Sequence, residues 1–185
     1  MSDPYLSVVI VGRNDDYGVD FMARLNTFVR SLDRQVKNHP RLVELIVVEW
    51  NPLPDRQPLA EVLAKVNNLC VRIITVPNAV HEQIGHSSPV LEYYGKNVGI
   101  RRARGRFVLT TNPDIIFTDH LINEIARREL DPAFFYRTDR YDFVGTGIES
   151  VEPDQYVDFA LAATFQGHLA TDDGYKTAVM EPSDT

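Results

Sequence analysis

Four apolar, β-branched runs with helix-like segments between them constrain the fold of this chain more than any other feature of its sequence. The first run, at residues 6–11 (LSVVIV), contains a single polar residue, which is typical of a strand buried on both faces. Comparable runs occupy residues 42–48, 71–76 and 106–111. Strands of this kind alternate with helices and need cover on each side of their sheet. The sequence therefore predicts an α/β fold with a mainly parallel sheet and helices on both faces.

The segments between these runs repeat apolar residues at spacings of three and four, the period of an amphipathic helix. Helices are expected over about 21–36, after Pro58, over about 90–103 and after Thr118, a residue that favours the N-cap position. Pro40 and Gly105 act as stop signals. The remaining expectations are a loop at 78–89, a short strand at 133–137, a helix at 156–165 and a frayed end from residue 172.

Composition narrows the class of protein further. Hydrophobic residues make up 44% of the chain and charged residues 24%, the balance of a soluble globular protein. No apolar run approaches the ~18–20 residues that a membrane span needs, and the segment MSDPYLS has no apolar region of the signal-peptide kind. The single cysteine, Cys70, leaves no partner for an internal disulfide. These features favour a cytoplasmic protein, and the length of 185 residues favours one main domain.

The chain carries 19 basic and 26 acidic residues, and its net charge of −7 disfavours non-specific binding to nucleic acid. Five basic residues nevertheless fall within eleven positions: Lys96, Arg101, Arg102, Arg104 and Arg106. This cluster is able to neutralise a small anion such as a diphosphate. Alternatively, these basic residues bind no anion and form a solvated face of a helix, where the helix dipole favours positive charges near the C-terminus.

Polar residues follow the first two runs, at the strand ends where parallel sheets bind ligands. After the first run, Gly12 permits a close backbone approach, and Arg13 and Asn14 add polar groups. After the second run, Glu49 supplies carboxylate oxygens suited to ribose hydroxyls or to a base edge. Alternatively, these residues bind no ligand and only form turns, because Gly, Asn and Asp are common turn residues.

The fourth run is followed by Asn112-Pro113-Asp114. Asp114 supplies a hard oxygen ligand for Mg²⁺ or Mn²⁺, and Asn112 offers a neutral oxygen. Pro113 fixes its own φ and holds Asn112 extended, which limits the freedom of the segment. The alternative here is a plain turn without a metal.

Several other kinds of site are disfavoured. The sequence has neither a P-loop lysine motif nor G-x-G-x-x-G, which disfavours a Walker ATPase and a standard dinucleotide-binding domain. Its five histidines are too scattered to predict a zinc site. Trp50 is interpreted as a core residue, with a stacking platform for a base as the alternative.

Four motifs in order carry a family resemblance. SVVIVGRND is similar to S-V-V-I-P-x-Y-N, and ELIVVEWNP is similar to E-I-I-V-V-D-D-G-S. GKNVGIRRARGRFVLTTNPD is similar to A-R-N-x-G-I-x-x-A-x-G-x-x-I-x-x-x-D-x-D. The D-x-D that ends this pattern is the fourth motif and binds the metal; Asn112-Pro113-Asp114 stands in its place. These are motifs of the nucleotide-binding N-terminal half of GT-A glycosyltransferases, and the chain resembles family 2 over about residues 5–130. One departure is Asn112, which stands at the first aspartate of D-x-D.

The resemblance implies a Rossmann-like GT-A nucleotide-diphospho-sugar transferase fold, with a nucleotide-sugar-binding domain at 1–150. Residues 151–185 would then be a C-terminal extension, a partial acceptor region or a frayed tail. It further implies transfer of a sugar, with inversion, from a nucleotide-diphosphate donor to a glycan, lipid or small-molecule acceptor, assisted by Mg²⁺ or Mn²⁺. The metal ligands would be Asp114 and Asn112. The nucleotide-sugar contacts would be Gly12, Arg13, Asn14, Glu49, Lys96 and Asn97.

The resemblance does not supply a catalytic base. In the family a carboxylate base follows D-x-D at a distance, and no segment after Asp114 matches it. Asp172 and Asp173 are present there, in an unlike context. Two alternatives therefore stay open: a nucleotide-sugar-binding module without turnover, and a sugar nucleotidyltransferase.

Overall fold

A computed structural model of the 185-residue chain describes residues 3–15, 18, 20–143, 147–171 and 174–179. The chain forms two compact units, Met1–Arg128 and Glu129–Thr185. Their boundary lies after residue 128. The functional division expected after residue 150 stays a prediction.

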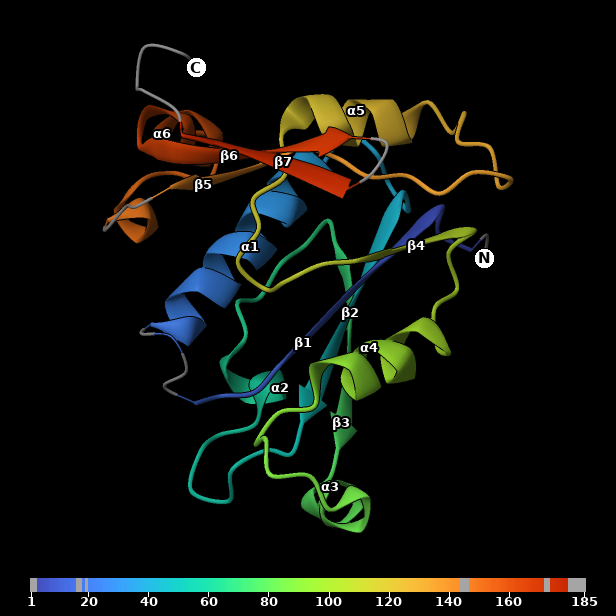
Figure 1. Ribbon diagram of the computed structural model, residues 1–185, viewed down its shortest axis with the longest axis vertical. Coiled ribbons are helices and arrows are strands. Elements are labelled where there is room, and N and C mark those ends of the chain that lie inside the picture. Colours follow the sequence, from blue (N-terminus) through green and yellow to red (C-terminus); the bar gives the residue numbers. More distant parts are fainter. Residues whose placement is uncertain (1–2, 16–17, 19, 144–146, 172–173, 180–185) are drawn as a thin grey trace. The chain divides into compact units, whose positions relative to one another are not determined.

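The first unit is built on a four-stranded sheet in which all strands are parallel, in the order β3-β2-β1-β4 (Figure 1). Its strands are β1 (Leu6–Gly12), β2 (Val43–Trp50), β3 (Cys70–Val76) and β4 (Phe107–Thr110). All residues of β1 and β2 are buried, as their largely apolar sequences predict. The expected α/β class with a parallel sheet is confirmed.

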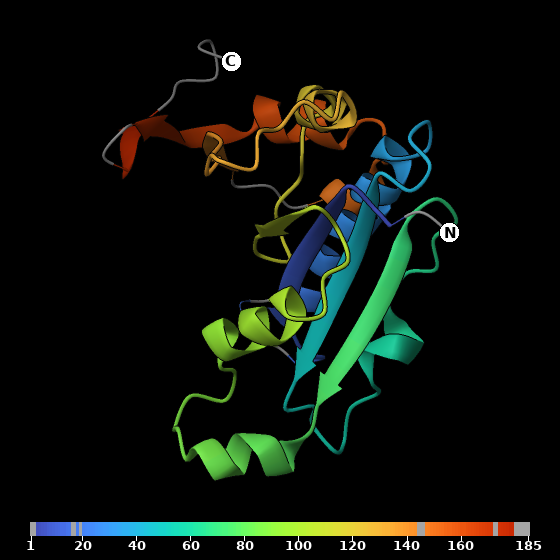
Figure 2. The same ribbon diagram turned by 90° about the vertical axis from the view of Figure 1, so that its right-hand side faces the viewer.

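Helices cover both faces of this sheet; Figure 2 shows α4 on one side and α2 on the other. The helices of the unit are α1 (Phe21–Gln35), α2 (Leu59–Val62), α3 (Asn78–Ile84), α4 (Glu92–Ile100) and α5 (Asp119–Ala126). On the face that α4 covers, Val9 and Val11 pack in one core cluster with Leu91. The side chains of a strand alternate between its faces, so Gly12 lies on the other face, where the ring of Phe21 from α1 lies against it.

Two glycines allow close approaches around β1. A Cβ on Gly99 of α4 would lie 2.4 Å from Cγ1 of Val9. A Cβ on Gly105, just before β4, would lie 2.5 Å from the backbone nitrogen of Ser7. A side chain at either position would therefore push its segment away from β1. The glycine spacing of the third motif thus has a packing reason in this chain.

A buried carboxylate, Glu44, holds the amino end of the sheet together. One carboxylate oxygen accepts hydrogen bonds from Ser7 Oγ at 2.6 Å and from the backbone N–H of Arg104 at 2.8 Å. The other accepts from Arg72 at 2.9 Å. Burial by itself raises the pKa of Glu44, but these hydrogen bonds and the positive charge of Arg72 outweigh it and hold the pKa below its usual value of 4.5.

We expect Glu44 to make the stability of the protein depend on acid pH. A carboxyl group whose folded pKa is lowered contributes stability above its unfolded pKa, and that stability is lost as the pH falls through the folded pKa. Below about pH 4.5, the free energy of unfolding of the wild type should therefore fall more steeply than that of Glu44→Gln, by up to about 1.4 kcal/mol per pH unit. Urea denaturation over this pH range measures the difference. Glu61→Gln, at an exposed position of α2, is the matched control and should retain the wild-type slope.

The second unit contains an antiparallel sheet in the order β5-β6-β7. Its elements are β5 (Arg140–Phe143), the short 3₁₀ helix η1 (Ile148–Ser150), α6 (Tyr156–Ala162), β6 (Thr164–Thr171) and β7 (Gly174–Val179). The helix expected at 156–165 is confirmed as α6, although β6 begins before residue 165.

Three local expectations were wrong, and a fourth, the helix after Pro58, is confirmed only in part. Residues 133–137 are not a strand; β5 begins later, at Arg140. The expected frayed end contains β7, which pairs along its length with β6. The expected loop at 78–89 begins with α3. This helix has no buried residue, so its sequence lacks the apolar stripe that would predict a helix. The helix after Pro58 is a single turn, since Leu63 already has an extended backbone.

Candidate functional site

The sheet has one topological switch point, between β1 and β4. From β1 the chain proceeds outwards to β2 and β3, and then returns to place β4 on the opposite side of β1. Open parallel sheets bind ligands beyond the carboxyl ends of the strands at such a point. Here those ends are Gly12 of β1 and the Asn112–Asp114 segment that follows β4. The fold thus brings two of the three predicted strand ends together at the switch point.

Two basic side chains from different helices flank the Asn112–Asp114 segment. Arg24 of α1 forms an ion pair with Asp114, with 2.6 Å between Nη1 and Oδ2. Lys96 of α4 approaches Oδ1 of Asn112 at 3.4 Å and forms an ion pair with Glu92 at 2.5 Å. Two cations from separate helices therefore lie at the switch point, and each is paired with a carboxylate in this structure.

The side-chain oxygens of Asp114 and Asn112 are the atoms that would bind the predicted Mg²⁺ or Mn²⁺. Divalent cations of this kind need several oxygen ligands, with a carboxylate among them. The carboxylate of Asp114 already accepts from a guanidinium, and the amide oxygen of Asn112 already faces an ammonium group. No group of three or more His, Cys, Asp or Glu residues among the described residues is arranged to hold a metal ion. As arranged, these residues do not fit a divalent cation, and the metal site stays a prediction.

The residues that follow β1 brace neighbouring loops. Arg13 is 9% exposed; its Nε donates to Asp15 at 2.7 Å, and its Nη1 donates to the carbonyl of Asn51 at 3.2 Å. Asn14 donates from its side chain to the carbonyl of Gln57 at 2.9 Å. These contacts tie the end of β1 to the chain that follows β2. Roles in nucleotide-sugar binding stay predictions for Gly12, Arg13 and Asn14.

Glu49 is 1% exposed, and both of its carboxylate oxygens accept hydrogen bonds. One accepts from the backbone N–H of Leu59, at the start of α2, at 2.8 Å; the other accepts from the hydroxyl of Thr75 at 3.1 Å. The carboxylate also lines a cavity of about 390 Å³ at the carboxyl ends of β2 and β3. The cavity is lined by Glu49, Pro52, Leu53, Pro54, Arg56, Pro58 and Thr75. A nucleoside contact by Glu49 stays a prediction, beside a structural role as the cap of α2.

The other residues that the sequence marks as candidates for binding do not lie together in the structure. Trp50 is 1% exposed, which confirms it as a core residue, and its Nε1 donates to Nδ1 of His81 at 3.1 Å. Asn97 lies exposed on α4. The five basic residues at 96–106 do not form a single patch: Lys96 lies at the carboxyl edge of the sheet, whereas Arg104 and Arg106 line a cavity beside the amino end of β1. Asp172 and Asp173 lie outside the described residues.

Arg24 is the residue that the sequence analysis missed. It lies on the polar side of an amphipathic helix, where basic residues are common, and no motif marks it. Its partner, Asp114, is 90 residues away in the chain. Only the packing of α1 beside β1 brings them together, so this ion pair has no local signal in the sequence.

Comparisons with known proteins give a partial likeness to a solved structure. No protein-family model matches the sequence, and no curated protein matches it significantly. In the structure, no helix among the described residues is both long enough and apolar enough to cross a membrane. Among solved structures, part of the chain is similar to residues 1–349 of S. aureus TarS, with 17% sequence identity and a TM-score of 0.38. This likeness covers 66% of the present chain and 31% of the TarS chain.

Proposed function

We propose that this chain binds a nucleotide-diphosphate sugar at the carboxyl edge of its parallel sheet and transfers the sugar to an acceptor hydroxyl. The observation that carries the proposal is the convergence of Arg24 and Lys96 on the Asn112–Asp114 segment at the switch point of the sheet. A diphosphate is a compact polyanion, and on binding it would take the place of Asp114 and Glu92 as the partner of these two cations. The motif resemblance to family 2 supplies the reaction type.

In this reaction the acceptor oxygen attacks the anomeric carbon, and the bond between that carbon and the diphosphate oxygen breaks. The acceptor proton passes to a base that the described residues do not identify. Negative charge grows on the leaving diphosphate as the bond breaks, and fixed positive groups are most effective where charge develops. In the proposed arrangement Arg24 and Lys96 carry this role, so no step is assigned to a metal ion.

A non-catalytic nucleotide-sugar-binding module is the second candidate. It is favoured by Glu49, whose two carboxylate oxygens both accept hydrogen bonds within the protein. Such a module would hold the donor and release nothing.

Product analysis with the full chain separates these functions. Sugar nucleotides with different bases are incubated with the protein, and binding is measured by calorimetry while products are followed by ³¹P NMR. We expect binding and slow release of nucleoside diphosphate, because general-base help is worth about 10²–10⁴ in rate and the base is not evident. Binding without release would indicate the module, and pyrophosphate exchange would indicate a nucleotidyltransferase. No binding of any sugar nucleotide would contradict the proposal.

A further inference from the structure

The short helix α3 lies beyond the carboxyl ends of β2 and β3, and none of its residues is buried (Figures 1 and 2). It is bounded by Pro77 and by Gly85, whose φ of +67° is left-handed. Two of its side chains, His81 and Ile84, are half-buried, and their spacing of three residues places them on one face of the helix. Ile84 packs against the core cluster that contains Trp50. This face attaches α3 to the first unit.

His81 attaches α3 through a hydrogen bond to a buried tryptophan. Nε1 of Trp50 donates to Nδ1 of His81 at 3.1 Å, and the planes of the two rings are 81° apart. Because the indole N–H can only donate, Nδ1 of His81 accepts, and the proton of the neutral imidazole is assigned to Nε2. Trp50 is 1% exposed, so its N–H depends on this acceptor from α3.

This hydrogen bond can form only while His81 is neutral. An imidazolium carries hydrogens on both ring nitrogens, so Nδ1 of a protonated His81 cannot accept from Trp50. Two donors would then oppose each other, and a buried polar group without a partner is unfavourable. Histidine is the side chain whose charge ordinarily changes between about pH 5 and 8. The attachment of α3 should therefore be complete at the upper end of this range and be lost as the pH falls.

No carboxylate among the described residues forms an ion pair with His81 that would stabilise its protonated form in place. The titratable side chains on the elements around it are Glu82 on α3, His86 after it, Glu49 on β2, and Glu92, Tyr94 and Lys96 on α4. Glu82 is exposed, and Glu92 is paired with Lys96. Glu49 precedes Trp50 on the strand, so its side chain lies on the opposite face of the sheet, where it accepts from Leu59.

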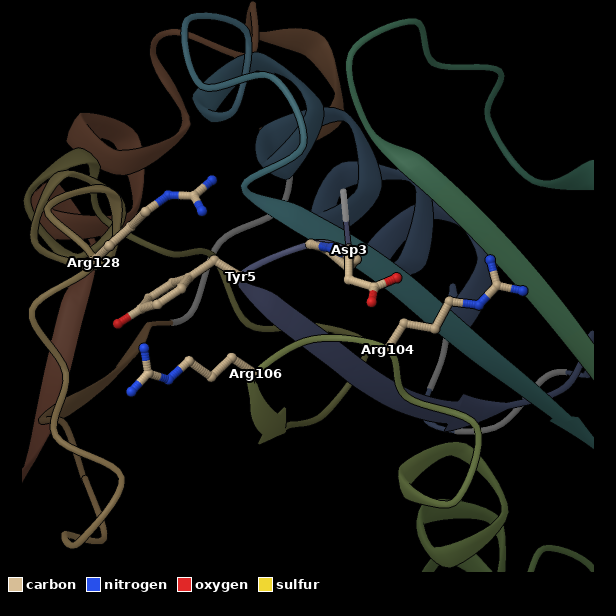
Figure 3. A pocket seen from close by; sticks show the side chains of 6 residues that line it. Asp3, Tyr5, Arg104, Arg106 and Arg128 are labelled. Atoms are coloured by element: carbon tan, nitrogen blue, oxygen red, sulfur yellow. The ribbon is translucent and has the colours of Figure 1, made fainter. Parts of the chain in front are cut away.

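More distant charges act on His81 only weakly. The arginines of the cavity in Figure 3 lie at the amino edge of the sheet, at the other end of the strands. The eight residues of β2 span about 26 Å, which is several times the screening length of about 8 Å at physiological salt. The nearest ring to the indole on α4 is that of Tyr94, with 6.3 Å between the centroids. The hydrogen bond to Trp50 is therefore the interaction that protonation of His81 changes most.

We propose that His81 is a pH-sensitive latch, which holds α3 against Trp50 while it is neutral and releases this helix from the carboxyl edge of the sheet when it is protonated. Release leaves the indole of Trp50 open to water. At the start of α3, Asn78 donates to the side-chain oxygen of Asn51 at 3.0 Å, and this contact does not titrate. The first turn of α3 therefore stays attached. The latch is independent of the proposed transferase function.

Trp50 is the only tryptophan of the chain, so its fluorescence reports on this contact. In the full chain, the emission maximum should shift to longer wavelength as the pH is lowered from about 8 to about 5, because the indole becomes exposed to water. His81→Gln should remove the shift, since the amide oxygen of glutamine accepts from Trp50 at every pH. His86→Gln is the matched control: it changes an exposed histidine just beyond α3 and should retain the shift.

Hydrogen exchange of the backbone amides of α3, corrected for the intrinsic effect of pH on exchange, distinguishes release from a change in place. Protection of these amides in the wild type should fall about tenfold over this pH range. It should stay high in His81→Gln and be low at both pH values in His81→Ala. The amides of β1 should remain protected throughout, which separates release of α3 from unfolding of the chain.

Three results would overturn the latch. The first is protection of α3 that does not depend on pH in the wild type, and the second is the same pH-dependent loss of protection in His81→Gln. The third is a loss of fluorescence intensity without a loss of protection, which would indicate quenching by an imidazolium that stays in place.

Discussion

Replacing Glu49 by alanine is expected to lower the free energy of unfolding by about 3 kcal/mol. The substitution leaves the backbone N–H of Leu59 without its acceptor in a buried position and removes the partner of the Thr75 hydroxyl. Glu49→Gln should cost only about 1 kcal/mol, because the amide oxygen can accept from Leu59 while the amide nitrogen donates to Thr75. Urea denaturation at neutral pH measures both values.

Glu61→Ala is the control for this experiment, since Glu61 is an exposed carboxylate on the same short helix. It should change stability by no more than about 0.5 kcal/mol. A Glu49→Ala variant as stable as this control would contradict the structural role of Glu49. The folded Glu49→Gln variant then tests the nucleoside contact separately: weaker nucleotide binding would support it, and unchanged affinity would remove Glu49 from the ligand site.

The sheet could be predicted from the sequence because burial on both faces has a direct signature. The run at 6–11 is typical of a strand buried on both faces, and the run at 42–48 has the same character. The strands of the other two runs, β3 and β4, lie at the edges of the sheet and are partly exposed. Gly99 and Gly105 could be placed by motif, and their close contacts with β1 explain why those positions are glycines. The structure confirms these features because each depends on a few neighbouring residues.

The features that could not be predicted depend on partners distant in the chain. β7 is a strand because it pairs with β6, and the composition of its own segment indicates only a polar end. The Arg24–Asp114 ion pair depends on the packing of α1 beside β1. From the sequence alone, Asp114 is predicted to be a metal ligand, because a carboxylate after a strand is typical of that role. In the structure its partner is Arg24 of α1, so a side-chain cation stands where a metal ion was predicted.

This ion pair leads to a second large expected effect, which rests on the proposed function. Arg24→Gln should weaken binding of a nucleoside diphosphate by about 10–100-fold in the presence of EDTA, because a charge-assisted contact to the diphosphate is lost. Arg34→Gln is the matched control: Arg34 lies on the same helix and pairs with Asp119 at 3.0 Å, away from the switch point. It should leave nucleotide affinity unchanged.

Asp114→Asn distinguishes a side-chain cation from a metal ion at the same position. If Arg24 neutralises the diphosphate, removing the carboxylate frees the guanidinium and removes a negative charge beside the ligand. Nucleotide binding should then tighten several-fold without metal and should not depend on Mn²⁺. A metal bound at Asp114 requires the opposite result, in which Asp114→Asn weakens binding and abolishes its dependence on Mn²⁺. Calorimetric titration of both proteins with a nucleoside diphosphate, with and without Mn²⁺, gives the sign of the change. Weaker binding by Asp114→Asn, found only when Mn²⁺ is present, would return Asp114 to the role of metal ligand and leave Arg24 as its partner in the unliganded protein.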